Sequence, residues 1–382
     1  MIPYGRQSID DSDIAAVEAV LRSDWLTQGP AVGRFERAVA DHTGAAHALA
    51  MNSATSALHV ACAVLDVGPH SRVWTVPNTF VASANCARYC GATVDFVDID
   101  AATYCIDSKD LARRLEVAAR SNTLPDVIVA VDFAGQPCDY AAIAELKARY
   151  GFRVIEDASH AVGARYRGDA VGSLAVADIT ILSFHPVKII TTAEGGMILT
   201  QDAEIARRVE SLRSHGIVRE AVQLQNAEEG AWYYEQQALG WNYRMTDMQA
   251  ALGASQMLRL DGFLARRRAL AARYDALLAG LPVTRPWQHP DGLSAFHLYP
   301  ILLEDAGTRR RVFDSLRSAG IWVQVHYIPV HLQPYYRQLG FAAGDFPVAE
   351  NYYARTLSIP MYAGLSDAAQ DRVVEALREA LA

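Results

Sequence analysis

The sequence predicts an α/β fold with a mostly parallel sheet that is covered by helices on both faces. Short apolar segments alternate with helical patterns through the first two-thirds of the 382 residues, which is typical of βα units. The chain is longer than one typical domain. We therefore expect an N-terminal arm with a large α/β domain over residues 1–245, and a bridging helix with a small C-terminal α+β domain over residues 246–382.

The elements of the large domain follow from short apolar runs and from apolar residues at helical spacing. The expected strands are His47–Met51, Arg72–Val76, Thr93–Asp98, Val127–Asp132, Arg153–Glu156, Ile179–Phe184 and Met197–Thr200. The expected helices between them include Ser53–Leu65, Thr79–Tyr89 and Tyr140–Tyr150. In the arm, Ser12–Arg22 carries Ile14, Val17, Val20 and Leu21 on one face. We expect that face to pack on the large domain.

The pattern changes after residue 245. Thr246–Leu281 is rich in Ala, Leu and Arg and predicts one long helical region that bridges the two domains. The small domain is then expected to contain strand His297–Leu303, helix Thr308–Ala319, strand Trp322–His326 and a terminal helix from Ser366.

Composition restricts the class of protein. Hydrophobic residues make up 51% and mean hydropathy is +0.04, enough for a large core. A net charge of −8 argues against a nucleic-acid binder. The N-terminus lacks a signal-peptide pattern and no apolar run reaches membrane-spanning length, so we expect a soluble cytoplasmic protein without a membrane partner. The five cysteines form no CxxC pair and predict core residues. We expect no metal site.

Two strand ends carry the most informative residues. Asp157 ends the strand V-I-E-D, and Lys188 follows the next apolar strand in S-F-H-P-V-K. An acid that keeps a pyridine nitrogen protonated and a lysine that forms a Schiff base are what pyridoxal phosphate chemistry requires. Apolar neighbours lower the pKa of a lysine toward the neutral amine. The alternatives are a turn-capping Asp and a solvated Lys; the following A-E-G-G favours the cofactor site.

Other motifs fit the same cofactor. N-S-A-T-S-A-L at 52–58 opens a helix directly after a strand, and Ser53, Ala54, Thr55 and Ser56 at its start are placed to hold a phosphate, unless the motif is only an N-cap. Ser183 adds a hydroxyl to that group. Phe80 is placed to stack on a pyridine ring or to join the core. His160 is placed to touch the ring or its hydroxyl, or to order a turn.

In this order, the motifs resemble the nucleotide-sugar aminotransferases of the DegT/DnrJ/StrS type, nearly end to end. Beyond those above, L-R-S-H-G and G-W-N-Y-R-M-T-D-M-Q-A-A-L-G carry the resemblance. It implies the fold of PLP-dependent transferases of fold type I. It also implies pyridoxal 5'-phosphate bound to Lys188 as an internal aldimine, with pyridoxamine phosphate formed in turnover.

A narrower likeness concerns the branch that acts in pseudaminic acid biosynthesis for cell-surface glycans. S-D-W-L-T-Q-G-P and V-Q-V-H-Y-I-P-V-H are similar to that branch. It implies transfer of the amino group of L-glutamate to C4 of UDP-2-acetamido-2,6-dideoxy-β-L-arabino-hex-4-ulose, giving UDP-4-amino-4,6-dideoxy-N-acetyl-β-L-altrosamine. Alternatives are another nucleotide 4-keto sugar (a UDP-4-keto-pentose or a dTDP-4-keto-6-deoxyhexose) and a non-catalytic regulator on the same fold. Pro186 and Ala193 depart from many relatives and bear on the branch.

The resemblance also assigns residues. Asn242 matches an asparagine that reaches the cofactor phosphate of the neighbouring subunit, which implies a homodimer with shared active sites. Arg244 is a candidate clamp for the glutamate carboxylate, with an interface ion pair as the alternative. The matched sugar contacts are Tyr4, Trp25, Leu26, Thr27, Gln324, Val325, His326 and Tyr327.

Overall fold

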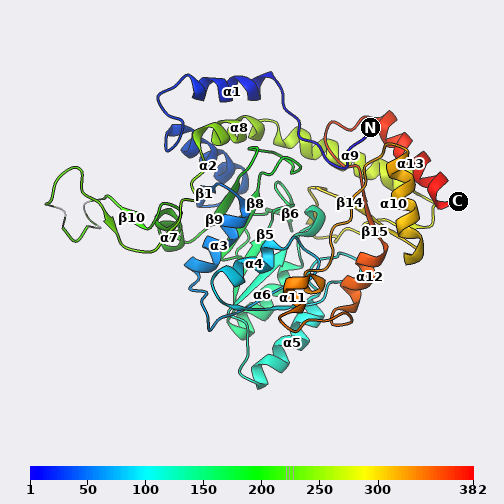
Figure 1. Ribbon diagram of the computed structural model, residues 1–382, viewed down its shortest axis with the longest axis horizontal. Coiled ribbons are helices and arrows are strands. Elements are labelled where there is room, and N and C mark those ends of the chain that lie inside the picture. The colour runs from blue at the N-terminus through cyan, green and yellow to red at the C-terminus, as the bar shows by residue number, and fades with distance from the viewer. Residues whose placement is uncertain (221, 223, 227) are drawn as a thin grey trace.

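The computed structural model describes residues 1–220, 222, 224–226 and 228–382. A seven-stranded sheet with helices on both sides forms its centre (Figure 1). The strand order is β1-β9-β8-β5-β4-β2-β3. Their bounds are β1 His47–Met51, β2 Arg72–Thr75, β3 Thr93–Phe96, β4 Val127–Val131, β5 Arg153–Asp157, β8 Ile179–Ser183 and β9 Gly196–Thr200. The expected α/β class and all seven expected strands are confirmed, with ends shifted by a few residues.

The sheet is parallel except at β9, which runs antiparallel to both of its neighbours, β1 and β8. The carboxyl ends of β1, β2, β4, β5 and β8 therefore meet at one edge. The turn from β8 to β9, which contains Lys188, lies at that edge. Gly196 lets β9 begin close to the start of the helix that follows β1: a Cβ there would lie 2.5 Å from the backbone nitrogen of Ala54.

Side chains alternate between the two faces of the sheet. Val129 and Ile155 pack on one face with α3 (Ala54–Val64), α4 (Ala82–Tyr89) and α7 (Ala203–Arg213). Ile128 and Val154 pack on the other face with α5 (Ser108–Arg120) and α6 (Tyr140–Tyr150). Continuous apolar strands buried on both faces are the pattern that parallel sheets require.

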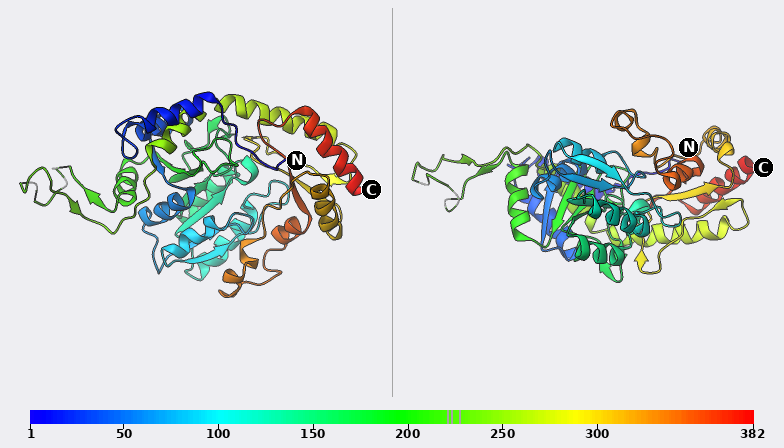
Figure 2. Two further views of the ribbon diagram at one scale, coloured as in Figure 1. Left: turned by 45° about the horizontal axis from the view of Figure 1, so that its top comes forward. Right: turned by 90° about the horizontal axis from the view of Figure 1, so that it is seen from below.

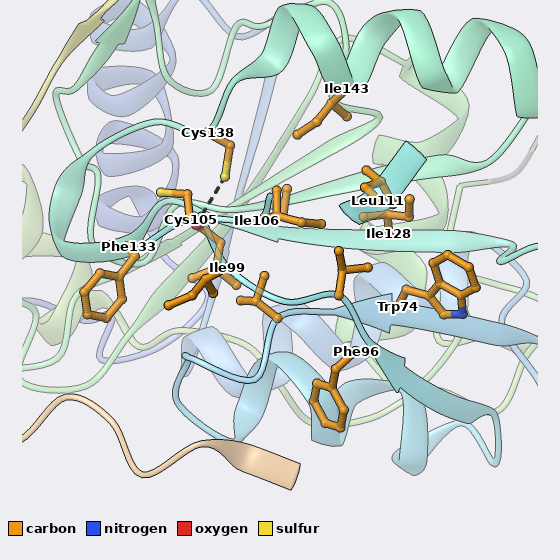
Figure 3. Packing of buried hydrophobic residues seen from close by; sticks show 14 of the residues in the cluster. Trp74, Phe96, Ile99, Cys105, Ile106, Leu111, Ile128, Phe133, Cys138 and Ile143 are labelled. Atoms are coloured by element: carbon orange, nitrogen blue, oxygen red, sulfur yellow. Dashed lines mark hydrogen bonds between the residues drawn. The ribbon is translucent and has the colours of Figure 1, made fainter. Parts of the chain in front are cut away.

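Four of the five cysteines are buried in these cores, and Cys90 is half-buried. Cys105 and Cys138 lie among Phe133, Ile99 and Ile106 (Figure 3). The expectation that the cysteines are mainly core residues is therefore confirmed. Within the described part of the chain, no group of three or more His, Cys, Asp or Glu side chains could hold a metal ion.

The N-terminal helix α1 (Asp11–Leu21) packs on α8 (Asp247–Met257), but only through part of the expected face. Ile14 and Leu21 are each 57% exposed, whereas Asp13 and Val20 are buried. Asp13 accepts a hydrogen bond from the Gln256 amide at 2.7 Å and pairs with Arg259. The expected burial of Ile14 and Leu21 was wrong, because a buried ion pair with a distant segment helps to decide which side of the helix is covered.

The expected single long helix after residue 245 is also wrong. It is two helices, α8 and α9 (Leu260–Leu277), separated at Leu258 and Arg259. Arg259 has φ −110° and ψ 1°, outside the helical region. Its guanidinium binds the carboxylates of Asp10, at 2.8 Å, and Asp13. No Gly or Pro marks this break, so it follows from the tertiary contact with the arm.

The C-terminal part contains a three-stranded antiparallel sheet, β12-β14-β15, formed by Val283–Thr284, Tyr299–Leu303 and Thr356–Ile359. The helices α10 (Arg309–Ser318) and α13 (Asp367–Leu381) contact each other beside it. The expected strand Trp322–His326 is absent; that segment makes only isolated bridges, from Ile321 to Ile2 and from Gln324 to Ser358. The division into two domains at residue 245 stays a prediction.

The remaining helices and strands comprise α2, which packs on α8, and several shorter elements. They are α2 Pro30–Thr43, β6 Arg165–Tyr166, β7 Asp169–Ala170, β10 Ile217–Val218, β11 Glu235–Gln236, β13 Gly292–Leu293, α11 Pro334–Arg337 and α12 Pro347–Arg355. The β10–β11 ribbon projects from the end of the molecule opposite to the C-terminus (Figures 1 and 2). None of the helices in the described ranges is both long and apolar enough to cross a membrane.

Candidate active site

A cavity of about 780 Å³ lies at the carboxyl edge of the sheet. Open α/β sheets bind their ligands at this edge. Segments that follow β1, β2, β5 and β8 line it together with the 324–328 segment of the C-terminal part. The predicted site residues in its wall are Tyr4, Ala54, Thr55, Phe80, Asp157, His160, Ser183, Lys188, Gln324, Val325, His326 and Tyr327.

Lys188 stands in the turn from β8 to β9. This turn is closed by backbone hydrogen bonds, including those from Phe184 to Gly195 at 2.9 Å and from Thr192 to Phe184 at 3.0 Å. Burial lowers the pKa of the Lys188 amine to about 8, although the nearby carboxylate of Asp157 opposes the shift. A larger share of the amine is therefore neutral near pH 8 than in an exposed lysine.

Asp157 ends β5 and its side chain is buried. Its Oδ2 accepts a hydrogen bond from the Ser83 hydroxyl at 2.6 Å, and Oδ1 accepts one from the backbone N–H of Ser159 at 3.2 Å. These two donors orient the carboxylate. Ser83 was not predicted from the sequence; its position three residues after Phe80, at the start of α4, was the available signal.

The start of α3 provides donors for an anion. Ser53 caps the helix: its hydroxyl accepts from the backbone N–H of Ser56 at 3.1 Å, and Ser56 in turn bonds Asn52 at 2.6 Å. The hydroxyls of Ser53 and Ser56 are thus used within the capping box. The backbone N–H groups of Ala54 and Thr55 have no intrahelical acceptor, as at any helix start. They line the cavity and can bind a phosphate.

Phe80 is a wall residue and not a core residue. Its side chain is 58% exposed, and its ring lies 6.3 Å from the ring of Tyr327. The alternative of a core phenylalanine is therefore wrong. A planar ring that enters the cavity between Phe80 and the sheet would have an aromatic face to stack on.

Three of the four histidines in the cavity wall, His160, His297 and His326, are buried and held neutral. Burial, then the charges of Lys188 and His326, keep the pKa of His160 well below its usual value. Burial and Lys188 lower the pKa of His326 to about 3. Burial, followed by the charge of His160, depresses the pKa of His297 in the same way. His297 was missed because it was assigned only to a strand; it precedes β14 and lines the cavity.

Five predicted residues do not line this cavity in the single chain: Trp25, Leu26, Thr27, Asn242 and Arg244. They gather instead near the start of α8. Thr27 pairs with Thr246, and Asn242 pairs with Ser214. Arg244 lines a second cavity of about 300 Å³ beside the ion pairs of Arg213 with Glu36 and Glu210.

The main cavity offers hydrogen-bond donors but few positively charged side chains. Lys188 and histidines are the basic residues in its wall, and no arginine contributes to it among the described residues. The wall nevertheless matches the parts of pyridoxal phosphate one by one. Asp157 can meet a pyridine nitrogen, the start of α3 with Ser183 can meet a phosphate, and Lys188 can meet an aldehyde.

Comparison with known proteins agrees with this geometry. Residues 7–378 match the DegT/DnrJ/EryC1/StrS aminotransferase family. The spore coat polysaccharide biosynthesis protein SpsC of Bacillus subtilis is 40% identical over 384 residues, covering 99% of this chain and 96% of the relative. A UDP-4-amino-4,6-dideoxy-N-acetyl-beta-L-altrosamine transaminase of Campylobacter jejuni is also 40% identical, over 367 residues, covering 95% and 93% of the two chains.

Solved structures show the same relationship. PseC of Helicobacter pylori, an aminotransferase involved in the biosynthesis of pseudoaminic acid, has a TM-score of 0.90 and 31% identity, with 100% and 99% of the two chains covered. The PLP form of the sugar aminotransferase Spr1654 of Streptococcus pneumoniae has a TM-score of 0.89 and 30% identity, with 99% and 98% covered.

The chain therefore belongs to the DegT/DnrJ/EryC1/StrS aminotransferase family. It is a pyridoxal phosphate-dependent nucleotide-sugar aminotransferase with the fold of the PLP-dependent aminotransferases.

Proposed function

We propose that this enzyme transfers the amino group of L-glutamate to C4 of UDP-2-acetamido-2,6-dideoxy-β-L-arabino-hex-4-ulose, which forms UDP-4-amino-4,6-dideoxy-N-acetyl-β-L-altrosamine. The observation that carries the reaction is the pair Lys188 and Asp157, which reach one cavity from the ends of the neighbouring strands β8 and β5. The choice of sugar is supported by the names of the Campylobacter and Helicobacter relatives.

In this proposal the cofactor, when bound, supplies an electron sink, and the chain's own residues position it and move the proton. Lys188 would hold the cofactor through Nζ, and the same amine, when free, would move the proton of the amino donor. A pKa of about 8 suits that task because both forms of the amine are populated near neutral pH. Asp157, oriented by Ser83, stays opposite the pyridine nitrogen. Ala54, Thr55 and Ser183 bind the phosphate.

The proposal includes a homodimer with shared sites. The cofactor phosphate, together with either the nucleoside diphosphate of the sugar or the two carboxylates of glutamate, brings several negative charges, and Lys188 with neutral histidines does not balance them. Asn242 and Arg244 lie outside their own chain's cavity, and Asn242 is exposed. Asn242, Arg244 and the Trp25–Thr27 segment would reach the partner's cavity in such a dimer. They would supply the positive charge and the hydrogen-bond donors that the single-chain cavity lacks. We place this enzyme in the cytoplasm, where nucleotide sugars are made.

The alternative substrate is another nucleotide 4-keto sugar, such as a UDP-4-keto-pentose or a dTDP-4-keto-6-deoxyhexose. The equal identity to SpsC, whose name specifies no sugar, keeps this alternative open. A non-catalytic role is disfavoured because Lys188, Asp157 and the phosphate donors all lie in one cavity.

The test offers L-glutamate with a panel of UDP- and dTDP-linked 4-keto sugars and identifies the products by mass spectrometry. Amination of the UDP-linked L-arabino sugar, with little product from the others, is expected. Preference for a pentose or a dTDP sugar would replace the proposed substrate. Absence of amination with every sugar, from protein that has bound the cofactor, would overturn the proposal.

A further inference from the structure

His160 and Tyr327 connect two parts of the cavity wall that are far apart in the sequence. His160 follows β5, and Tyr327 belongs to the 324–328 segment. The Nε2 atom of His160 lies 3.1 Å from the Tyr327 hydroxyl oxygen. The direction of this hydrogen bond depends on which ring nitrogen of His160 carries the proton.

The backbone of Ala134 decides that proton's position. The N–H of Ala134 donates to Nδ1 of His160 at 3.3 Å. A backbone N–H can only donate, so Nδ1 carries a lone pair and no hydrogen. Because burial and the charge of Lys188 keep the pKa of His160 low, the ring is neutral and its proton is on Nε2. His160 therefore donates, and the Tyr327 oxygen accepts.

Tyr327 must then direct its own proton elsewhere. Burial, followed by Tyr4 and Asp157, raises the pKa of Tyr327, so the phenol stays protonated. His160 is the hydrogen-bond partner of its hydroxyl within the described chain. Since Tyr327 lines the cavity, its O–H is available to a ligand as a donor.

The surroundings hold this arrangement rigidly. Ala134 has φ 59° and Gly135 has φ 99°, and a Cβ on Gly135 would lie 2.9 Å from the carbonyl oxygen of His160 and the nitrogen of Phe296. The turn after β4 thus packs directly on the backbone that bears His160. On another side, the His297 ring lies 4.5 Å from the His160 ring.

We propose that His160 is a positioning residue that fixes Tyr327 as a hydrogen-bond donor to an acceptor oxygen of the bound ligand. This inference rests on the proposed function for the identity of the ligand. The two candidate oxygens are the hydroxyl oxygen on the cofactor's pyridine ring and the 4-keto oxygen of the sugar. A fixed donor requires an acceptor oxygen on the ligand, and the 4-keto oxygen can only accept.

The first test concerns the proton itself and does not depend on the substrate. Long-range 1H–15N spectra of the full-length protein labelled in its 11 histidines are recorded with the cofactor bound. The signal that disappears in His160→Gln identifies His160. We expect the neutral Nε2–H tautomer from pH 6 to pH 9. An Nδ1–H tautomer or a charged ring in that range would overturn the proposal, whatever the fate of the proposed reaction.

The second test separates positioning from packing. Gln can place an N–H where Nε2 lies, whereas Leu cannot. We expect Tyr327→Phe and His160→Leu to lose similar amounts of amino-transfer activity relative to the wild type, whereas His160→Gln keeps most of it. The double variant Tyr327→Phe/His160→Leu should lose no more activity than Tyr327→Phe alone. If the double variant shows the sum of the two single losses, at equal thermal stability, His160 does not act through Tyr327.

Two measurements on Tyr327→Phe identify which oxygen accepts its hydrogen bond. If Tyr327 serves the cofactor, Tyr327→Phe moves the pH midpoint of the visible absorbance of the bound cofactor by roughly 0.5–1 unit. If it serves the keto sugar, that midpoint stays and the KM for the sugar rises roughly fivefold or more. No change in either quantity would overturn the proposal.

Discussion

The carboxyl groups of Asp132 and Glu156 lie side by side in the core, on the face of β5 opposite to Asp157. Both side chains are fully buried. One oxygen of each group is satisfied: Tyr140 donates to Asp132 Oδ1 at 2.8 Å, and Thr180 donates to Glu156 Oε2 at 2.6 Å. The other two oxygens, Oδ2 and Oε1, lack a donor within the described chain. Two carboxyl groups that share one proton satisfy both oxygens.

This pair predicts that the protein loses stability as pH rises through neutrality. Burial raises the pKa of Glu156 to about 7 from 4.5, so the folded state binds more protons than the unfolded state between those values. The stabilisation is complete below about pH 4.5 and is lost as pH rises past about 7. In Asp132→Asn the side-chain N–H can donate to Glu156, so no shared proton is needed. We therefore expect the loss of unfolding free energy across this pH range to be smaller by about 1–3 kcal/mol than in the wild type.

Urea unfolding at pH 5, 6, 7 and 8 measures the effect, with the exposed Glu145→Gln on α6 as the matched control. If the free energy of unfolding of the wild type falls with pH and that of Asp132→Asn falls equally steeply, the pair does not share the proton.

Replacement of Lys188 by Ala should abolish covalent attachment of the cofactor. The visible absorbance of the covalently attached cofactor should disappear and amino transfer should fall by about 10³-fold or more. Lys109→Ala, at an exposed position on α5, is the matched control and should behave as the wild type. Full activity of Lys188→Ala would remove Lys188 from the mechanism.

The Ser83 hydroxyl should tighten cofactor binding through Asp157. Its hydrogen bond of 2.6 Å reaches a charged acceptor, and such bonds contribute more than neutral ones. Ser83→Ala should weaken cofactor binding about tenfold or more, measured as the cofactor concentration that half-restores absorbance after its removal. Ser83→Cys, with a weak donor of similar size, should fall between the two. Equal cofactor affinity in the wild type, Ser83→Ala and Ser83→Cys would mean that Ser83 contributes only packing.

Asn242 should act in the cavity of the partner subunit. Lys188→Ala and Asn242→Ala are each expected to be nearly inactive. After mixing and subunit exchange, half of the dimers are mixed and each carries one complete site, so about a quarter of the wild-type activity should return. No recovery, with exchange verified by mass spectrometry, would place Asn242 in its own chain's site or outside any site.

The central sheet and the core of the site follow closely from the sequence. Strands such as Ile179–Ser183 are continuous apolar runs, and residues at the ends of parallel strands meet at one edge without further information. For this reason the sequence predicts that Asp157, Lys188 and the start of α3 lie close together, and all three line one cavity. The same reasoning held only in part for α1, where Val20 of the predicted apolar face is buried together with Asp13, but Ile14 and Leu21 are exposed.

Tertiary structure decided the features that join residues distant in the chain. The break between α8 and α9 depends on Arg259 binding the arm, and the orientation of Asp157 depends on Ser83. The tautomer of His160 depends on one N–H of Ala134. Local patterns determine which residues are buried and at which strand end they stand. They do not determine which partner a buried polar group meets, because that partner comes from another element whose position only the packed fold defines.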